Sequence, residues 1–271
     1  MIVHLLIVWG VTVVAILLAR LIVSRRNLEE DEDPPDYKVV LGFVASAYGL
    51  LLGLLVVFAV GHYNDTRSKA EDEATSLVAL DNAVAVWPKA TRAPYRHDLL
   101  CYMNSVVVDE WPSMEDGNST ESPQTLAWGD HLRAATRELP LDTDQERTGY
   151  GRALGFVTDA GKARQQLLFF TEPRIPTALW VVIYVGVFLM VLLISLIYTD
   201  NPQGRMTALA CLILLLSVVV AVLSVLDRPF GPGVRVPPNE MRQAIALLAA
   251  GHTSVDLQQA CQSGPPKVGQ G

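Results

Sequence analysis

The sequence has few of the residues on which enzymatic and metal-based chemistry depend. Its 271 residues include 3 cysteines and 5 histidines. The histidines are isolated, without the His-Glu-x-x-His spacing of zinc enzymes, and there is no Gly-x-Ser-x-Gly nucleophile elbow. Cys101, Cys211 and Cys261 lie far apart, so we expect neither a disulfide framework nor a metal site. These absences predict a protein that is not an enzyme, with no catalytic residues, no cofactor and no metal.

The sequence also has fewer basic than acidic residues. The chain has 21 Lys and Arg against 28 Asp and Glu, for a net charge of −7. This balance disfavours a nucleic-acid-binding surface.

Ionisable side chains are almost missing from the long apolar stretches. Proton pumps, voltage sensors and ion-coupled transporters usually keep such groups inside the membrane. Here only His4 qualifies, and it lies near a chain end. Active ion-coupled transport is therefore disfavoured, whereas passive conduction and a purely structural role both stay open.

Four apolar blocks dominate what is present, at residues 2–23, 39–60, 177–198 and 206–226. Each has about the 20 residues with which a helix crosses a hydrocarbon core. The blocks lack the alternation of barrel strands. The first has neither a positive segment before it nor an Ala-x-Ala site after it, so we interpret it as a retained helix rather than a signal peptide. The sequence predicts an all-α integral membrane protein with four transmembrane helices.

The rest of the chain is organised around these spans. Residues 61–176 are enough for one helical extramembrane domain, inserted between the second and third spans. We predict five regions: the first span and an acidic loop (1–38), the second span continuing as a long extramembrane helix (39–87), the helical domain (88–176), the third and fourth spans (177–226), and a Pro/Gly turn, a short amphipathic helix and a disordered tail (227–271).

Helix periodicity and proline positions set the expected boundaries. The second span should continue to residue 87, because apolar or small residues recur every seven positions and no proline interrupts the helix before Pro88. Further helices are expected near residues 94–111, 123–139 and 142–170. The acidic run at residues 29–33 could attract a divalent cation, but without EF-hand spacing it is more typical of a solvated loop.

Small residues form one narrow stripe on the second span, at Gly42, Ser46, Gly49 and Gly53. Such a stripe is most often a surface for close helix packing. The alternative is a pore wall, where symmetry-related helices approach a common axis and bulk is excluded.

Two residues near the end of the same span extend the pore hypothesis. Phe58 and the neighbouring valines would form an apolar constriction that gates by dewetting. His62 would be a pH-sensitive rim, although a histidine in this position often only marks the membrane interface.

Several short motifs, in this order around four spans, resemble the bestrophin-like domain family over roughly residues 39–250. They are Glu73-Ala74-x-x-Leu77, Tyr102, Glu110-Trp111-Pro112-x-Met114, Ile175-Pro176-x-x-Leu179-Trp180 and Pro229-Phe230-Gly231. One departure is Leu167, where the resemblance leads us to expect a second arginine three residues after Arg164.

The resemblance implies the architecture of the remotely related bestrophins. These are pentameric channels, anion-selective in animals and cation-selective in some bacterial members, with a pore lined by the second span. It implies a homo-oligomer that conducts inorganic ions, with Gly49, Gly53, Val57 and Phe58 as pore-lining candidates. The calcium clasp of the animal channels has no counterpart here.

The basic residues do not settle the orientation of the chain. Those in or beside the two short loops favour placing these loops in the cytosol: Arg20, Arg25, Arg26, Lys38 and Arg205. Basic residues also flank the spans on the domain side, and the resemblance puts the domain in the cytosol. We expect a multi-pass protein of a bacterial plasma membrane with the large domain in the cytosol.

Two functional hypotheses from different classes follow. The first is an oligomeric bestrophin-like ion channel that conducts passively through a pore lined by the second span. The alternative is a non-conducting membrane scaffold or sensor that presents its helical domain to a soluble partner.

Overall fold

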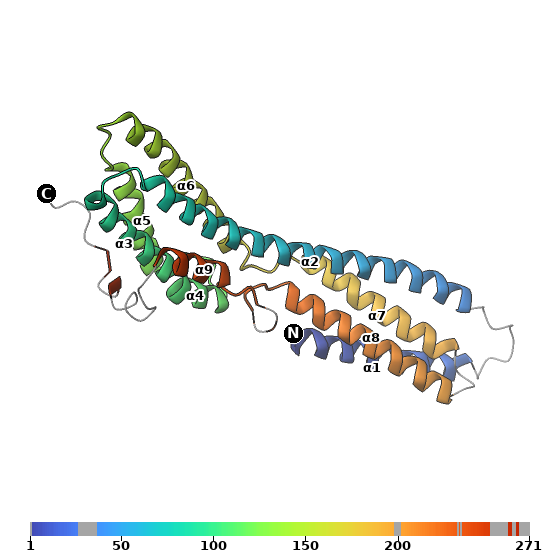
Figure 1. Cartoon of the computed structure of the whole chain (residues 1–271). Helices are drawn as coiled ribbons and strands as arrows, with labels where there is room; N and C mark the ends of the chain where they lie inside the picture. Colours follow the sequence, from blue (N-terminus) through green and yellow to red (C-terminus); the bar gives the residue numbers. More distant parts are fainter. Residues whose placement is uncertain are drawn as a thin grey trace. The chain divides into compact units, whose positions relative to one another are not determined.

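The computed structural model describes residues 2–26, 37–197, 202–231, 233, 235–249, 260–261 and 264–265. Every regular element within these residues is a helix, which confirms the all-α prediction. The chain divides into two compact units (Figure 1). Unit 1 comprises Met1–Tyr63 and Pro173–Asp227, and unit 2 comprises Asn64–Glu172 and Arg228–Gly271.

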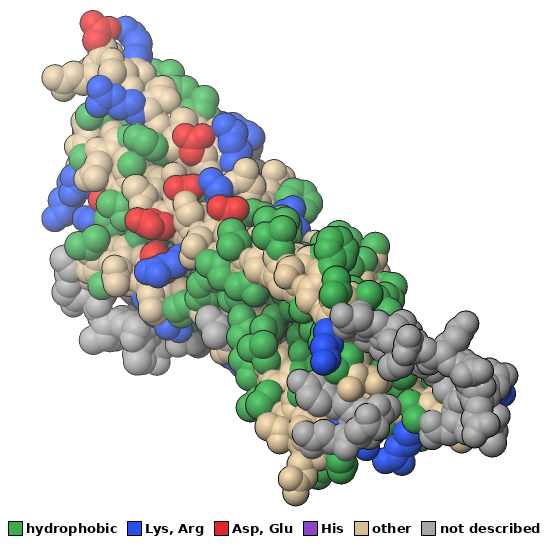
Figure 2. Space-filling model, turned by 90° about the vertical axis from the view of Figure 1, so that its right-hand side faces the viewer, with side chains coloured by type: hydrophobic (Ala, Val, Ile, Leu, Met, Phe, Trp, Pro, Cys, Tyr) green, Lys and Arg blue, Asp and Glu red, His purple; other side chains and the backbone are tan. Residues whose placement is uncertain are grey.

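Unit 1 is built from four apolar helices: α1 (Ile2–Arg26), the first part of α2 (Tyr37–Val84), α7 (Thr177–Ile197) and α8 (Pro202–Leu226). All four are long and apolar enough to cross a membrane, as the sequence predicted. Many of their large side chains are exposed, including Leu50 at 78% and Leu54 at 70%. Figure 2 shows hydrophobic side chains over much of the visible surface of unit 1. A surface of this kind needs lipid or another subunit around it.

Close contact between α2 and α7 depends on a glycine. The hydroxyl of Tyr48 donates a hydrogen bond to the carbonyl oxygen of Ile183, at 2.8 Å. Its ring lies against Gly186, where an added Cβ atom would collide with the ring carbons. The small residue that permits close packing inside unit 1 is therefore on α7, not on the glycine stripe of α2.

The end of unit 1 at which α7 begins is held by polar contacts. The buried carboxylate of Asp227 accepts hydrogen bonds from the backbone N–H groups of Arg174 and Ile175, at 2.9 and 2.8 Å. His4 stacks on Trp180 and shares a 2.6 Å hydrogen bond with Tyr184. The one histidine inside an apolar span thus has a packing partner and a hydrogen-bond partner within its own unit.

The second span continues without a break, as expected. Helix α2 has 48 residues and ends at Val84, three residues before the predicted end. At about 1.5 Å per residue it is roughly 70 Å long, more than twice the roughly 30 Å of a hydrocarbon core.

Unit 2 is a set of shorter helices: α3 (Lys89–Ser105), η1 (Val106–Glu110), α4 (Trp111–Glu115), α5 (Pro123–Arg137), α6 (Asp144–Phe169) and α9 (Asn239–Leu248). The start of α5 is confirmed, because the Ser122 side chain accepts from the Thr125 N–H. Helix α6 starts with a reciprocal capping box between Thr143 and Glu146.

One predicted boundary is wrong. The helix expected over residues 94–111 begins at Lys89 and continues past Pro112 into α4. Between α3 and α4 the chain forms one wide π-helical turn, η1. Pro112 has no N–H to donate to the preceding turn of a helix. The π-helical turn directly before α4 changes the hydrogen-bond register close to this missing donor, and the helix continues past the proline.

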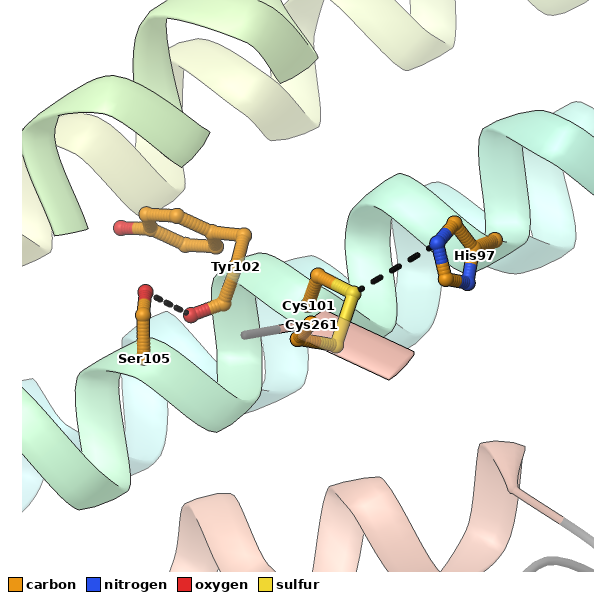
Figure 3. The surroundings of a disulfide bond; sticks show 5 residues. All are labelled: His97, Cys101, Tyr102, Ser105 and Cys261. Atoms are coloured by element: carbon orange, nitrogen blue, oxygen red, sulfur yellow. Dashed lines mark hydrogen bonds between the residues drawn. A yellow bond between two sulfur atoms is a disulfide. The ribbon is translucent and has the colours of Figure 1, made fainter. Parts of the chain in front are cut away.

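The expectation that the cysteines form no disulfide is also wrong. Cys101 on α3 and Cys261 near the C-terminus are bonded to each other across 160 residues of sequence (Figure 3). Spacing alone cannot reveal such a pair, because it depends on the fold bringing the tail onto α3. The acidic run at residues 29–33 and most of the predicted tail lie outside the described residues.

Candidate pore face and the buried node of unit 2

The small-residue stripe of α2 is not packed against any other described helix of its own subunit. A Cβ atom added at Gly42, Gly49 or Gly53 would have no neighbour within 4 Å. Ser46 is exposed, and its hydroxyl donates to the carbonyl of Gly42 at 2.8 Å. Packing against the described part of the same subunit therefore does not account for the stripe.

Another face of α2 is the one that enters the core of unit 1. Its buried residues recur at helical spacing: Tyr48, Leu52, Leu55, Ala59 and His62. His62, the expected pore rim, is 8% exposed and belongs to this packed face. The stripe residues occupy the exposed remainder of the helix.

The structure does not bring all the pore candidates onto one face. Val57 is 69% exposed and lies one turn beyond Gly53, beside the stripe. Phe58 is 51% exposed, but it follows Gly49 by nine residues, and at about 100° per residue this spacing points the two in opposite directions. The stripe with Val57, hereafter the stripe face, and Phe58 are therefore two separate candidate surfaces.

Unit 2 contains a buried ion pair that joins three of its helices. Arg164 on α6 contacts Glu73 on α2 through Nη2, at 2.8 Å from Oε1 and 2.7 Å from Oε2. The hydroxyl of Tyr102 on α3 donates to the same carboxylate at 3.1 Å. Both charged side chains are almost completely buried, at 2% and 0% exposed. A pair like this is strongly coupled and is costly to break on one side only.

The charges in this pair stabilise each other. Burial alone disfavours a charged guanidinium, but the Glu73 carboxylate, with Tyr102 and Glu110, outweighs it and raises the pKa of Arg164. Burial also raises the pKa of the Tyr102 phenol, and the neighbouring Glu73 charge adds to this effect. Tyr102 is therefore a permanent donor to the carboxylate.

Aromatic residues extend the ion pair into a larger node. The guanidinium of Arg164 lies over the Trp111 ring, 5.8 Å from its centroid. Trp111 in turn meets Phe230 edge to face, at 5.8 Å between centroids, and its Nε1–H donates to the carbonyl of Val236 at 2.9 Å. We call Glu73, Tyr102, Trp111, Arg164 and Phe230 the buried node.

The node gathers motifs that are far apart in the sequence. The neighbouring Glu110 is also fully buried and accepts from the Ser122 N–H at 2.8 Å. At the place where a second arginine was expected, Leu167 is fully buried instead. Glu73 is the one ion-pair partner of Arg164 in the described ranges of the chain. Among the described residues, no three His, Cys, Asp or Glu side chains gather in a way that could hold a metal ion.

Comparison with known proteins decides the family. The sequence matches the bestrophin-like domain over residues 6–241. This chain belongs to the bestrophin-like domain family. No curated protein matches the sequence.

Solved structures share the fold. Two single-residue variants of a bacterial bestrophin homologue from Klebsiella pneumoniae are similar, with TM-scores of 0.64 and 0.63, each at 12% identity. The matches cover 92% and 96% of this chain and 98% of each homologue chain. A structure described only as a membrane protein variant has a TM-score of 0.60 at 12% identity, covering 97% of this chain and 99% of the other. The all-α, bestrophin-like fold predicted from the motifs is therefore confirmed.

Proposed function

We propose that this bestrophin-like protein is a homo-oligomeric channel that conducts inorganic ions passively through a pore lined by α2. The observation that carries the proposal is the stripe face, where a Cβ atom added at any of the glycines would have no neighbour within 4 Å among the described residues of the subunit. The family resemblance suggests five subunits. A bacterial plasma membrane is the proposed location.

The stripe face suits a pore axis for a physical reason. Helices that surround a common axis approach one another most closely there, and small residues leave room for a path. Val57 adds an apolar side chain one turn beyond Gly53, where it could narrow the path and gate it by dewetting. The absence of Asp, Glu, Lys and Arg from residues 39–60 fits passive conduction better than ion-coupled transport.

Phe58 does not lie on the stripe face, so it would not line the same pore as the stripe residues. If the stripe faces the axis, Phe58 points away from it, toward a neighbouring subunit or lipid. The opposite register would put Phe58 on the axis as the constriction and the stripe outside. We favour the first register, because it assigns one role to Gly42, Ser46, Gly49, Gly53 and Val57 together.

The test is conductance of the purified full-length protein in planar bilayers. Gly49→Val and Gly53→Val add bulk to the stripe and should reduce single-channel current at least several-fold. Gly10→Val is the matched control, because Gly10 on α1 also has no neighbour within 4 Å, and it should leave the current unchanged.

The same recordings separate the two registers. A larger current in Phe58→Ala, with Gly49→Val unchanged, would put the axis on the Phe58 side. Silence of the wild-type protein across pH and calcium concentrations, with folding and insertion verified, would reject conduction. The membrane scaffold that presents unit 2 to a soluble partner would then be the better hypothesis.

A further inference from the structure

One cavity in unit 1 has no role in the proposed conduction path. It lies where α1 ends and α8 begins, and its volume is about 490 Å³. Its polar lining includes Arg20 from α1, Ser195 from α7 and Arg205 from α8. Its apolar lining includes Ile16 and Leu209. A cavity with cationic groups beside an apolar wall suits an amphipathic anion.

The two arginines give the cavity a positive charge that no carboxylate among the described residues pairs with. Neither Arg20 nor Arg205 has an ion-pair partner within the part of the chain that the structure describes. Arg205 lies in the first turn of α8, a helix of 25 residues. The N–H groups and macrodipole at a helix start add to the attraction for an anion.

A buried hydroxyl supplies an independent indication of a ligand. Ser195 is 3% exposed, lines the cavity, and its Oγ has no hydrogen-bond partner among the residues that the structure describes. Other hydroxyls of unit 1 donate to a carbonyl one turn back: Thr12 to Val8, Ser46 to Gly42 and Ser224 to Val220. Ser217 also lacks a partner but does not line this cavity. A buried polar group without a partner is costly unless a ligand or water satisfies it.

We propose that this cavity binds the phosphate group of an anionic phospholipid. Arg20 and Arg205 would pair with the phosphate, Ser195 would donate a hydrogen bond, and an acyl chain would follow the apolar wall at Ile16 and Leu209. Arginine is well suited to phosphate because its planar fork can donate two hydrogen bonds. Basic pockets between transmembrane helices are a known form of anionic-lipid site.

The test measures lipid retention by the full chain. The protein is placed in nanodiscs of equal phosphatidylcholine and phosphatidylglycerol, released, and examined by native mass spectrometry. The wild type should retain phosphatidylglycerol in preference to phosphatidylcholine. In the double variant Arg20→Gln/Arg205→Gln, the ratio of retained phosphatidylglycerol to retained phosphatidylcholine should fall at least tenfold. In Ser195→Ala this ratio should fall by a smaller factor. Arg25→Gln is the matched control: it removes an exposed arginine near the end of α1 that does not line the cavity.

Three results would overturn the proposal. The first is equal retention of the two lipids by the wild type, and the second is an equal loss in Arg25→Gln and the double variant. The third is displacement of the lipid by millimolar inorganic phosphate, which would make a free anion the ligand. A melting temperature for each variant close to that of the wild type excludes misfolding as the cause.

A second inference rests on a different observation, the disulfide between Cys101 and Cys261 (Figure 3). Both cysteines are buried in unit 2, at 0% and 5% exposed. Disulfides persist in oxidising compartments and are rare in the bacterial cytosol. The short loops on the other side of the spans carry Arg25, Arg26, Lys38 and Arg205, and basic short loops usually stay in the cytosol.

We infer that unit 2 lies on the extracytosolic side, opposite to the side that the family resemblance implies. Both the disulfide and the loop charges fit this orientation. The lipid site would then lie at the cytosolic leaflet, where anionic lipid gives the membrane surface a negative potential.

The test traps thiols in intact bacterial cells that express the wild-type chain. After acid quenching, alkylation under denaturing conditions without reductant should label Cys211 and leave Cys101 and Cys261 unlabelled. Cys101 and Cys261 should become labelled once the sample is reduced. In a second arm, Gln165→Cys on α6 should react with a membrane-impermeant maleimide in spheroplasts, whereas Ser24→Cys on α1 should react only after lysis. Alkylation of Cys101 and Cys261 without reductant, or the reverse pattern of maleimide labelling, would overturn the inference.

Discussion

Units 1 and 2 of this protein place polar and apolar groups in opposite ways. Unit 1 exposes large apolar side chains such as Leu50 and Leu54, at 78% and 70%. Unit 2 buries a complete ion pair, Arg164 and Glu73, at 2% and 0% exposed. The exposed apolar side chains of unit 1 suit a surrounding of lipid, whereas unit 2 holds its interior together with hydrogen bonds and buried charge.

The sharpest test of this contrast removes one half of the buried pair. Arg164→Met leaves the Glu73 carboxylate buried without its cation, which should cost about 3–5 kcal/mol of the free energy of unfolding. Thermal or denaturant unfolding of the detergent-solubilised chain, followed by circular dichroism, measures this loss. The double variant Glu73→Leu/Arg164→Met should recover much of it, because neither member of the pair is then buried without its partner. Full stability of Arg164→Met alone would show that the node does not support unit 2.

The loss in Arg164→Met should also depend on pH. Burial raises the pKa of Glu73, and without the opposing charge of Arg164 the rise is larger. A carboxyl group with a pKa raised by folding contributes most to stability when protonated, and this contribution disappears as pH increases. The deficit of the variant relative to the wild type should therefore be smaller at pH 5 than at pH 8. A deficit that grows toward acid would contradict this account.

The disulfide should have the next largest effect. Cys101→Ser releases a covalent link that spans 160 residues of sequence, and loss of a native disulfide typically costs about 2–4 kcal/mol. Cys211→Ser provides the control, because Cys211 is a free, exposed cysteine and its replacement should leave stability within about 0.5 kcal/mol. Equal stability of the two variants under non-reducing conditions would mean that the disulfide does not stabilise unit 2.

Two glycines of unit 1 allow a smaller but well-controlled comparison. Gly186→Ala places a methyl group against the ring of Tyr48, and such overpacking typically costs about 1–3 kcal/mol. Gly49→Ala meets nothing within 4 Å and adds helix propensity, so subunit stability should be unchanged or slightly higher. Unfolding in detergent that keeps the subunits apart measures both. A loss of stability in Gly49→Ala would indicate that the stripe has a partner in its own subunit.

Apolar run length and proline positions were enough to predict the four helices of unit 1 and the length of α2. The four spans and the long continuation of α2 follow from apolar run length and from the lack of proline before Pro88. The opposite directions of Gly49 and Phe58 also follow from their nine-residue spacing. The pore hypothesis treated them as one lining without applying this period, although the signal was present.

Other features of the site could not be read from the sequence. The pairing of Cys101 with Cys261 depends on where the tail folds. The cavity between Arg20 and Arg205 depends on how the end of α1 meets the start of α8. Each joins residues more than a hundred positions apart, and no local pattern encodes such contacts. The motif residues of the buried node were recognised, but only the fold shows that they touch.

The smallest predicted change in stability comes from an exposed ion pair whose charged atoms are as close together as those of the buried pair. Arg147 Nη1 lies 2.7 Å from the Asp144 carboxylate at the start of α6, as close as Arg164 Nη2 to Glu73. The side chains of Arg147 and Asp144 are 61% and 97% exposed, so water and salt screen their attraction. Arg147→Gln should therefore change the free energy of unfolding by no more than about 0.5 kcal/mol, and less at high salt. A loss comparable to that of Arg164→Met would show that the distance between the charged atoms, rather than their burial, determines how much an ion pair in unit 2 contributes to the free energy of unfolding.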